Sequence, residues 1–174
     1  ALSYIPDGCI IAMDSGTTSF ELARLLKEKK NLTILTNSLH IAIELGMNTN
    51  HMVYCIGGLI KNRELISTGF LAANFMDHFS QIDIAAVSTD GFTIENGLED
   101  YSVDMGILKK MIIEKSKKVI ALIDHTKFGI KAFYKTCDSK RINILITDTK
   151  TPSDYIDRIS GMDIEVCIVN PEKE

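Results

Sequence analysis

The sequence predicts an α/β fold, with a mostly parallel open sheet flanked by helices. Short apolar runs rich in β-forming residues alternate along the chain with longer segments of helical period, which is typical of this class. The chain has 174 residues, of which 45% are hydrophobic, so it can build one domain with a full core and has little left for a second. We expect a single domain that covers residues 1–174.

The short apolar runs are the predicted strands. Two further segments, 57–68 and 89–102, are polar, follow a strand and are too long for simple connections, so we expect functional or disordered loops there. In chain order the predicted strands are 9–13, 32–36, 51–56, 82–88, 118–124, 142–147 and 163–169.

Segments of helical period lie between these strands. The first spans 18–29 and opens on Thr18-Ser-Phe-Glu21, the pattern of a capping box. The last opens on Thr151-Pro-Ser-Asp154, with Thr151 as the N-cap and Pro152 at the first helical position. The other three cover about 38–45, ending at Gly46, about 70–78 and about 103–117.

Charge and hydropathy exclude several classes of function. The formal net charge is −4, so the chain as it stands is poorly suited to neutralise the phosphate backbone of a nucleic acid. No apolar run approaches the roughly 18–20 residues that cross a bilayer, and the first residues lack the charged and apolar regions of a signal peptide. We expect a cytoplasmic protein that makes no membrane contact.

Cysteines and histidines carry no predicted chemistry. The cysteines stand singly, without a C-x-x-C pair, and no histidine has ligand-like spacing to another or to a cysteine. We therefore predict reduced core cysteines, no metal site and no cofactor. The cysteines are Cys9, Cys55, Cys137 and Cys167.

The candidates for chemistry are polar residues that directly follow strands, because ligands of open parallel sheets bind beyond the carboxyl ends of the strands. Asp14-Ser-Gly-Thr-Thr18 follows the first strand and combines a glycine, hydroxyl donors and a helix N-terminus, which suits a phosphate. The same residues also fit a simple N-cap with a turn glycine. The pattern leaves both interpretations open.

Four later segments repeat this placement. Thr36-Asn-Ser38 and Gly57-Gly58 follow the second and third strands, Asp90-Gly91 follows the fourth, and a run containing Lys127 follows the fifth. Each alone also fits a cap, a turn or a solvated side chain. Together they offer hydroxyl and phosphate recognition beside an acid and a lysine, which suits a sugar phosphate. Lys109 and its neighbour Lys110 look like a solvated helix face, although one of them could point over the strand ends.

Taken in order, these motifs closely resemble the effector-sensing domain of the DeoR family of bacterial transcriptional repressors, over nearly the whole chain. The family's Asp-x-Gly-Thr-Thr, Thr-Asn-Ser, Gly-Gly and Asp-Gly match the four segments 14–18, 36–38, 57–58 and 90–91. Gly97-Leu98, Lys109, the Asp-x-x-Lys-Phe-Gly run at 124–129 and Ile146-Thr-Asp148 complete the series. Two positions depart from the family: Lys61 stands where members usually have Arg, and Glu99-Asp100 replaces small or hydroxyl residues.

The resemblance implies a fold like that of ribose-5-phosphate isomerases, glucosamine-6-phosphate deaminases and CoA transferases. It implies a sensor that binds a phosphorylated sugar without turning it over, while an N-terminal winged helix-turn-helix domain outside this chain binds operator DNA. Residues 1–8 would then be a remnant of the linker to that domain, and the sensor would form a homo-oligomer. The implied ligand-binding residues are Asp14, Gly16, Thr17, Thr18, Thr36, Asn37, Ser38, Gly57, Gly58, Lys61, Asp90, Gly91, Lys109 and Lys127.

Two other functions stay open. One is a sugar-phosphate isomerase or deaminase on the same fold, with Asp90 as the base and a lysine as its electrostatic partner. The other is a pure oligomerisation module whose cleft is vestigial. The apolar stretch 70–76 is a candidate surface for the homo-oligomer, and core packing accounts for it equally well. We predict no catalytic residue, because the spacing identifies no pair of titratable groups with opposed roles.

Overall fold

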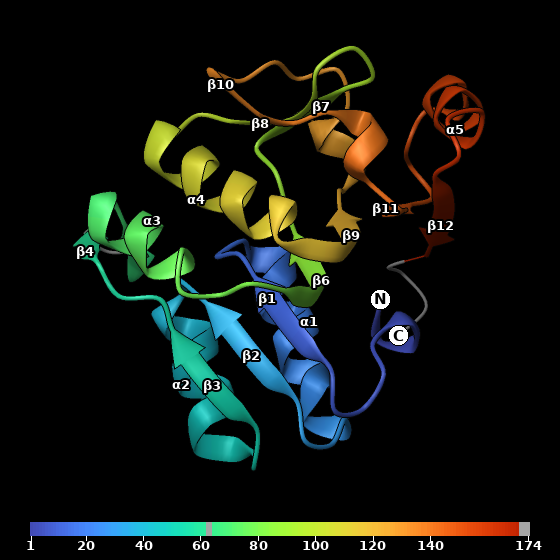
Figure 1. The fold of residues 1–174 in the computed structure, drawn as a ribbon. Coiled ribbons are helices and arrows are strands. Elements are labelled where there is room, and N and C mark those ends of the chain that lie inside the picture. Colours follow the sequence, from blue (N-terminus) through green and yellow to red (C-terminus); the bar gives the residue numbers. More distant parts are fainter. Residues whose placement is uncertain (62–63, 171–174) are drawn as a thin grey trace.

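The computed structural model describes residues 1–61 and 64–170, and a seven-stranded parallel sheet forms its centre. The strand order is β12-β11-β9-β6-β1-β2-β3, so the chain starts in the middle of the sheet and winds outward in both directions (Figure 1). All seven predicted strands are confirmed, with ends that differ from the prediction by at most two residues. They are β1 (Ile10–Met13), β2 (Thr33–Thr36), β3 (Met52–Cys55), β6 (Ile82–Val87), β9 (Ser116–Leu122), β11 (Ile144–Asp148) and β12 (Glu165–Val169).

Helices cover both faces of this sheet and divide the core in two. One face packs against the apolar sides of the first two helices, through residues such as Leu22 and Ile41. The other face packs against the remaining three, through residues such as Met76, Ile112 and Ile159. The helices are α1 (Thr17–Leu25), α2 (Leu39–Asn48), α3 (Phe70–Met76), α4 (Val103–Glu114) and α5 (Ser153–Ser160). None of the helices in the described ranges is long and apolar enough to cross a membrane.

Several predicted helix boundaries are wrong. The N-cap of α1 is Gly16, which has no side chain to accept a capping hydrogen bond. The capping box predicted at Thr18 therefore does not form. Gly46 lies inside α2, which runs on to Asn48 because the following Thr49 is the first residue to adopt an extended conformation. Pro152 occupies the N-cap of α5 and not its first turn. The helices predicted to end at 29 and about 117 end earlier, at Leu25 and Glu114, and β9 begins where the second of them was expected to continue. Element boundaries are the least reliable part of a prediction from local sequence signals.

Both segments predicted to be loops contain strands. The first forms an antiparallel hairpin of β4 (Leu59–Lys61) and β5 (Ile66–Thr68). The second contributes β7 (Gly91–Thr93) and β8 (Gly97–Asp100), which join β10 (Tyr134–Cys137) in a three-stranded antiparallel sheet. These strands of three or four residues are too short to show an alternating pattern, and partners elsewhere in the chain stabilise them.

How far each cysteine is exposed depends on where it lies in the fold. Cys9 and Cys137 are buried, and Cys167 is half-buried. Burial raises the pKa of the Cys137 thiol to about 11. The prediction of a core position is wrong for Cys55, which is exposed because β3 is the edge strand.

Candidate functional site

A pocket of about 690 Å³ opens at the carboxyl ends of the central strands. Its walls come from the loop after β1 and the start of α1, from the start of α2, and from the segments that follow β6 and β9. A fourth wall is part of the β4–β5 hairpin. The lining residues are Ser15, Gly16, Thr17, Thr18, Phe20, Glu21, Ser38, His40, Glu64, Ile66, Ser88, Thr89, Asp90, Leu122, Asp124 and Lys127.

The N-terminus of α1 faces this pocket through Gly16, Thr17 and Thr18. The backbone N–H groups of a first helical turn have no partner within the helix, and their dipoles favour an anion. A glycine is required at the N-cap because a Cβ on Gly16 would lie 1.9 Å from Ser88 Oγ. This close approach joins the start of α1 to the end of β6.

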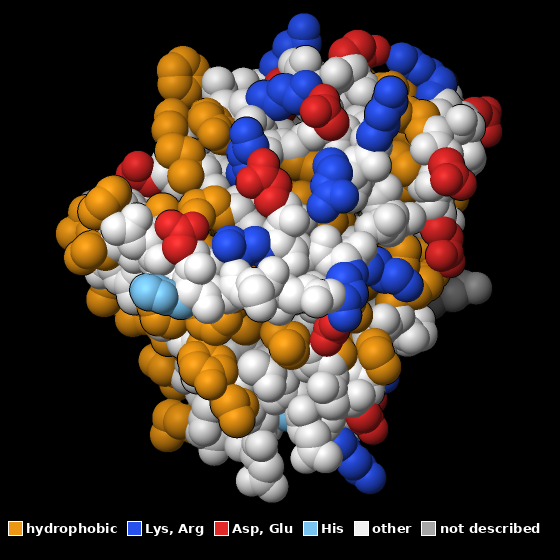
Figure 2. Space-filling model, viewed as in Figure 1, with side chains coloured by type: hydrophobic (Ala, Val, Ile, Leu, Met, Phe, Trp, Pro, Cys, Tyr) orange, Lys and Arg blue, Asp and Glu red, His pale blue; other side chains and the backbone are white. Residues whose placement is uncertain are grey.

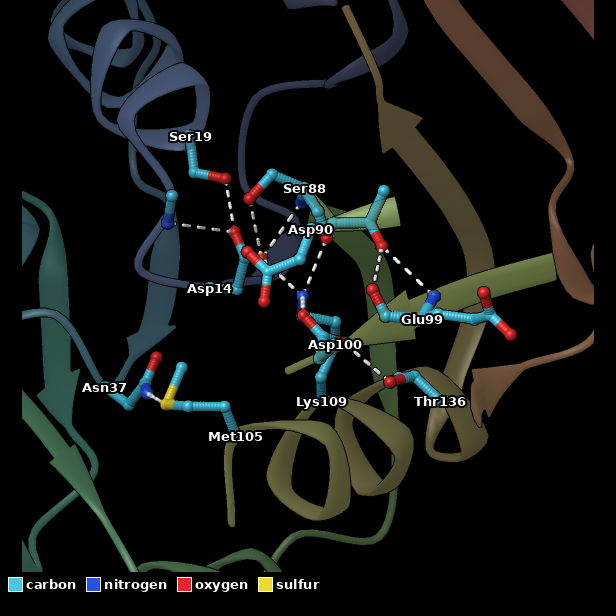
Figure 3. A network of polar contacts seen from close by, with 12 residues as sticks. Asp14, Ser19, Asn37, Ser88, Asp90, Glu99, Asp100, Met105, Lys109 and Thr136 are labelled. Atoms are coloured by element: carbon cyan, nitrogen blue, oxygen red, sulfur yellow. Dashed lines mark hydrogen bonds and ion pairs between the residues drawn. The ribbon is translucent and has the colours of Figure 1, made fainter. Parts of the chain in front are cut away.

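Asp14 lies beneath the pocket and organises this turn. Its carboxylate is buried and accepts hydrogen bonds from the Ser19 hydroxyl and from the backbone N–H and hydroxyl of Ser88, the last two at 2.9 Å. These contacts connect β1, α1 and the residue after β6 (Figure 3). Asp14 therefore shapes the floor of the pocket and does not line it.

Lys109 is the cation of a buried charge cluster beside Asp14. Its ammonium lies 2.5 Å from Asp100 Oδ1 and 3.3 Å from Asp14 Oδ2, and it donates to the Ser88 carbonyl at 2.8 Å. The second Asp100 oxygen accepts from Thr136 Oγ1 at 2.5 Å. Figure 3 shows these groups converging from five separate segments of the chain. Of the two orientations that the sequence leaves open for Lys109, the solvated face is wrong, because the side chain is buried. Lys109, although predicted as a ligand residue, does not line the pocket.

Electrostatics in this cluster follow from two carboxylates sharing one ammonium. Burial alone would lower the pKa of Lys109, but the neighbouring Asp14 and Asp100 outweigh it and raise that pKa. Burial raises the pKa of Asp100, and the opposing effect of Lys109 is the smaller one. The ammonium of Lys109 is thus neutralised by carboxylates within the protein and does not face the pocket.

Six of the predicted ligand residues meet at the pocket: Gly16, Thr17, Thr18, Ser38, Asp90 and Lys127. One carboxylate oxygen of Asp90 accepts a hydrogen bond from the backbone N–H of Tyr101 at 2.9 Å. Lys127 belongs to a 3-10 helix, His125–Lys127, whose N-cap Asp124 accepts the Thr126 N–H. The expectation that polar residues following parallel strands meet at one edge of the sheet therefore identifies residues that come together at the pocket.

Other predicted residues lie behind the pocket wall. Thr36 accepts the Ser38 N–H and so fixes the turn at the start of α2, while Asn37 donates to the Ser67 carbonyl and so holds β5 against that turn. Asn37 Oδ1, Ser67 Oγ and Thr68 Oγ1 are buried without a hydrogen-bond partner among the described residues. Asn37 therefore positions the hairpin wall.

Two of the predicted glycines away from α1 serve close packing, whereas a Cβ on Gly57 would meet nothing within 4 Å. A Cβ on Gly58 would lie 2.6 Å from the Thr68 carbonyl oxygen, and one on Gly91 would lie 2.4 Å from the Ile130 carbonyl oxygen. Neither these two nor Gly57 lines the pocket. Lys61 ends β4, and its side chain lies outside the described part of the structure.

Sequence reasoning missed several lining residues. Ser88 and Thr89 directly follow β6, so the strand-end rule could have found them. Glu64 and Ile66 reach the pocket only because the hairpin folds back onto the segment after β2, where Leu39 N–H donates to the Leu65 carbonyl. No local signal predicts that contact.

Comparison with known proteins identifies the family. A model of the "DeoR C terminal sensor domain" matches residues 1–149, which run from the N-terminus through β11. The chain belongs to the DeoR family. It is 33% identical over 150 residues to the HTH-type transcriptional regulator GolR of Listeria innocua, covering 86% of this chain and 59% of GolR. It is 27% identical over 173 residues to the HTH-type transcriptional repressor GlcR of Bacillus subtilis, covering 99% of this chain and 66% of GlcR.

This DeoR-family chain thus spans about three fifths of the length of the regulators it matches. Among solved structures, it is similar to a D-ribose-5-phosphate isomerase in complex with phospho-erythronic acid. That match has a TM-score of 0.51 and 17% identity, and it covers 73% of this chain and 49% of the isomerase. Such a likeness shows a shared fold, and the expected isomerase-like architecture is confirmed.

Proposed function

We propose that this DeoR-family domain is an effector sensor that binds a phosphorylated sugar in the pocket described above. Occupancy would change how a helix-turn-helix domain of the whole regulator binds operator DNA, in the cytoplasm where that DNA lies. The observation that carries the proposal is the N-terminus of α1, which is capped by a glycine and whose first residues, Thr17 and Thr18, line the pocket.

Charge fixes the orientation of the ligand in this proposal. The described lining contains four carboxylates, Glu21, Glu64, Asp90 and Asp124, and Lys127 as its lysine. A phosphate is therefore accommodated at the amides and hydroxyls of Thr17 and Thr18, and the carboxylates accept hydrogen bonds from sugar hydroxyls. Asp14 and Lys109 act from below, by holding the turn that presents these donors.

The alternative function is an isomerase or deaminase on the same fold. Such an enzyme needs an acid and a base that reach the substrate from opposite sides. Asp14 and Lys109, which are close enough to exchange a proton, are buried against each other and against Asp100. GolR and GlcR are named as regulators, so the comparisons also favour the sensor.

Self-association is the second part of the proposal. Phe70 and Leu71 on α3 and Leu59 on β4 are each more than 60% exposed. Figure 2 shows hydrophobic side chains gathered along the side of the molecule where α3 and β3 lie. An apolar surface of this kind marks an interface, and a second copy of the chain is the partner that we propose.

Calorimetry on this domain tests the sensor proposal. Ribose, deoxyribose, fructose and glucosamine phosphates are titrated beside the unphosphorylated sugars, and at least one phosphate is expected to bind while its parent sugar does not. Thr18→Val should weaken that binding about tenfold or more, since a hydrogen bond to a charged group contributes about 1.5–3 kcal/mol. NMR of the same mixtures should show no ketose–aldose exchange and no ammonia release. Absence of binding across the panel, or turnover lost in Asp90→Asn, would contradict the proposal.

A further inference from the structure

A second cavity, of about 370 Å³, lies beside the effector pocket and shares three of its lining residues, Thr18, Leu122 and Asp124. It sits over the carboxyl ends of β9, β11 and β12. We call it the apolar annex. Because Thr18 also belongs to the first turn of α1, the annex begins where the proposed phosphate site ends.

Aliphatic side chains form the inner wall of the annex, chiefly Leu122, Ile146 and Val169. Leu122 and Ile146 are buried in the core behind it, whereas Val169 on the edge strand is 44% exposed. Val169 also lies beyond residues 1–149, the part of the chain that the family model matches. One wall of the annex therefore comes from outside the matched part of the chain.

Several polar groups on the β11 side of the annex already have hydrogen-bond partners. Asp148 accepts the backbone N–H of His125 at 2.8 Å, and its carboxylate lies 3.0 Å from His125 Nδ1. The Thr147 and Thr151 hydroxyls are hydrogen-bonded at 2.6 Å. A hydroxyl group that entered this space would lose its hydrogen bonds to water and find few replacements, which makes its burial costly. The annex therefore favours an apolar group over a further sugar ring.

We propose that the apolar annex is a subsite for an apolar substituent on the effector, so that the natural ligand is a sugar phosphate bearing an aryl-sized or short alkyl group. This inference rests on the proposed function, because it places the phosphate at α1. Two features carry it: the annex is continuous with the effector pocket at Thr18, and the surface that it exposes is almost entirely apolar, whereas the pocket exposes a substantial polar share. A pocket of about 690 Å³ is already of the size that holds drug-like ligands, so a plain sugar phosphate needs no annex.

Methyl and amide NMR with two small probes tests the inference without knowledge of the sugar. Inorganic phosphate should shift the Thr17 and Thr18 amides and leave the annex methyls unchanged. Phenyl phosphate should shift the same amides and also the methyls of Leu122, Ile146 and Val169, and it should bind at least fivefold more tightly than inorganic phosphate.

A matched pair of variants completes the experiment. Val169→Asp should abolish the additional affinity that the phenyl group gives phenyl phosphate, while the affinity for inorganic phosphate stays within twofold of the unmodified domain. Ile168→Asp is the control, because Ile168 is the neighbouring residue on the opposite face of β12 and is similarly exposed, at 49%.

The outcomes separate the inference from the proposed function. If both probes shift the α1 amides but phenyl phosphate binds no more tightly and leaves the annex methyls unmoved, the annex inference is wrong and the proposed function stands. If neither probe shifts the amides, the phosphate site is wrong. Phenol alone is then added, and shifts of the annex methyls would make the annex a separate site, which also overturns the inference.

Discussion

The ammonium of Lys109 lies 3.3 Å from Asp14 Oδ2, and this contact joins the middle of α4 to the end of the central strand β1. Neither residue lines the pocket, yet Asp14 holds Ser88 and Ser19, which shape its floor. Through Asp100, the same lysine is also tied to β8. The charge cluster is therefore the point at which the main sheet, α4 and the small antiparallel sheet are fixed relative to one another.

Lys109→Met should destabilise the domain by about 3–5 kcal/mol. The change removes the cation and leaves Asp14 and Asp100 buried without their partner, which is the costly way to break a buried ion pair. Urea denaturation measures the effect. The control is Lys110→Met, since Lys110 is adjacent and half-exposed, and its change should stay within about 0.5 kcal/mol. A loss below about 1 kcal/mol for Lys109→Met would show that the cluster does not stabilise the fold.

Gly16→Ala should disrupt the N-terminus of α1. The new Cβ would lie 1.9 Å from Ser88 Oγ and 2.8 Å from Ser88 Cβ, so the turn has to shift. We expect phosphate affinity, measured by calorimetry, to fall more than tenfold, and Ser88→Gly in the same chain to restore part of it. Gly46→Ala is the matched control, because a Cβ there meets nothing within 4 Å and an alanine inside α2 should stabilise by about 0.5–1 kcal/mol. Equal effects of the two substitutions would count against the close-approach argument.

The pair formed by Asp148 and His125 predicts a pH dependence. Burial alone would raise the pKa of Asp148, but hydrogen bonds from the backbone and ring of His125 and from the Lys150 backbone hold it below its ordinary value of 3.8. A carboxyl whose pKa is lower in the folded state stabilises the fold above pH 4, and this contribution disappears as the pH falls through the folded pKa.

Asp148→Asn should therefore lower the free energy of unfolding by about 1 kcal/mol at pH 7, where the native carboxylate accepts charge-assisted bonds. The difference between the two proteins should shrink as the pH falls below 4 and disappear once the pH is below the folded-state pKa of Asp148. Thermal unfolding over a series of pH values from 7 downward checks this. A difference that stays constant across the range would mean that the effect is one of shape and not of charge.

Phe70→Lys together with Leu71→Glu should reduce self-association. Both side chains are exposed on α3 and contribute little to the core, so the fold should survive while the apolar surface is interrupted. Light scattering at micromolar concentration should show a multimer for the unmodified domain and a smaller species for the variant. Leu25→Glu on α1, at a side chain that is also exposed, is the control and should leave the mass unchanged. A monomeric mass for the unmodified domain would exclude the proposed interface.

The residues of the pocket show how far sequence alone can go. Thr17, Ser38, Asp90 and Lys127 were predicted as neighbours from one rule, that polar residues after parallel strands meet at one edge of the sheet. The rule works because the seven apolar runs are long enough to identify locally, and the register of a parallel sheet then brings their ends together. The family motifs add the identity of the domain, since they follow one another in order.

What only the tertiary structure decided is which side of each element faces inward. Lys109 and Lys110 are adjacent and chemically identical, yet one neutralises two buried carboxylates and the other is solvated. Successive residues of a helix point about 100° apart, and the direction of the core depends on how α4 packs against the sheet. The hairpin wall around Ile66 and the strands β7 and β8 arise in the same way, because their hydrogen bonds are made with partners distant in the chain. Local propensity governs elements that can be recognised by their own pattern, whereas short strands and buried charges are fixed by contacts that exist only after the chain has folded.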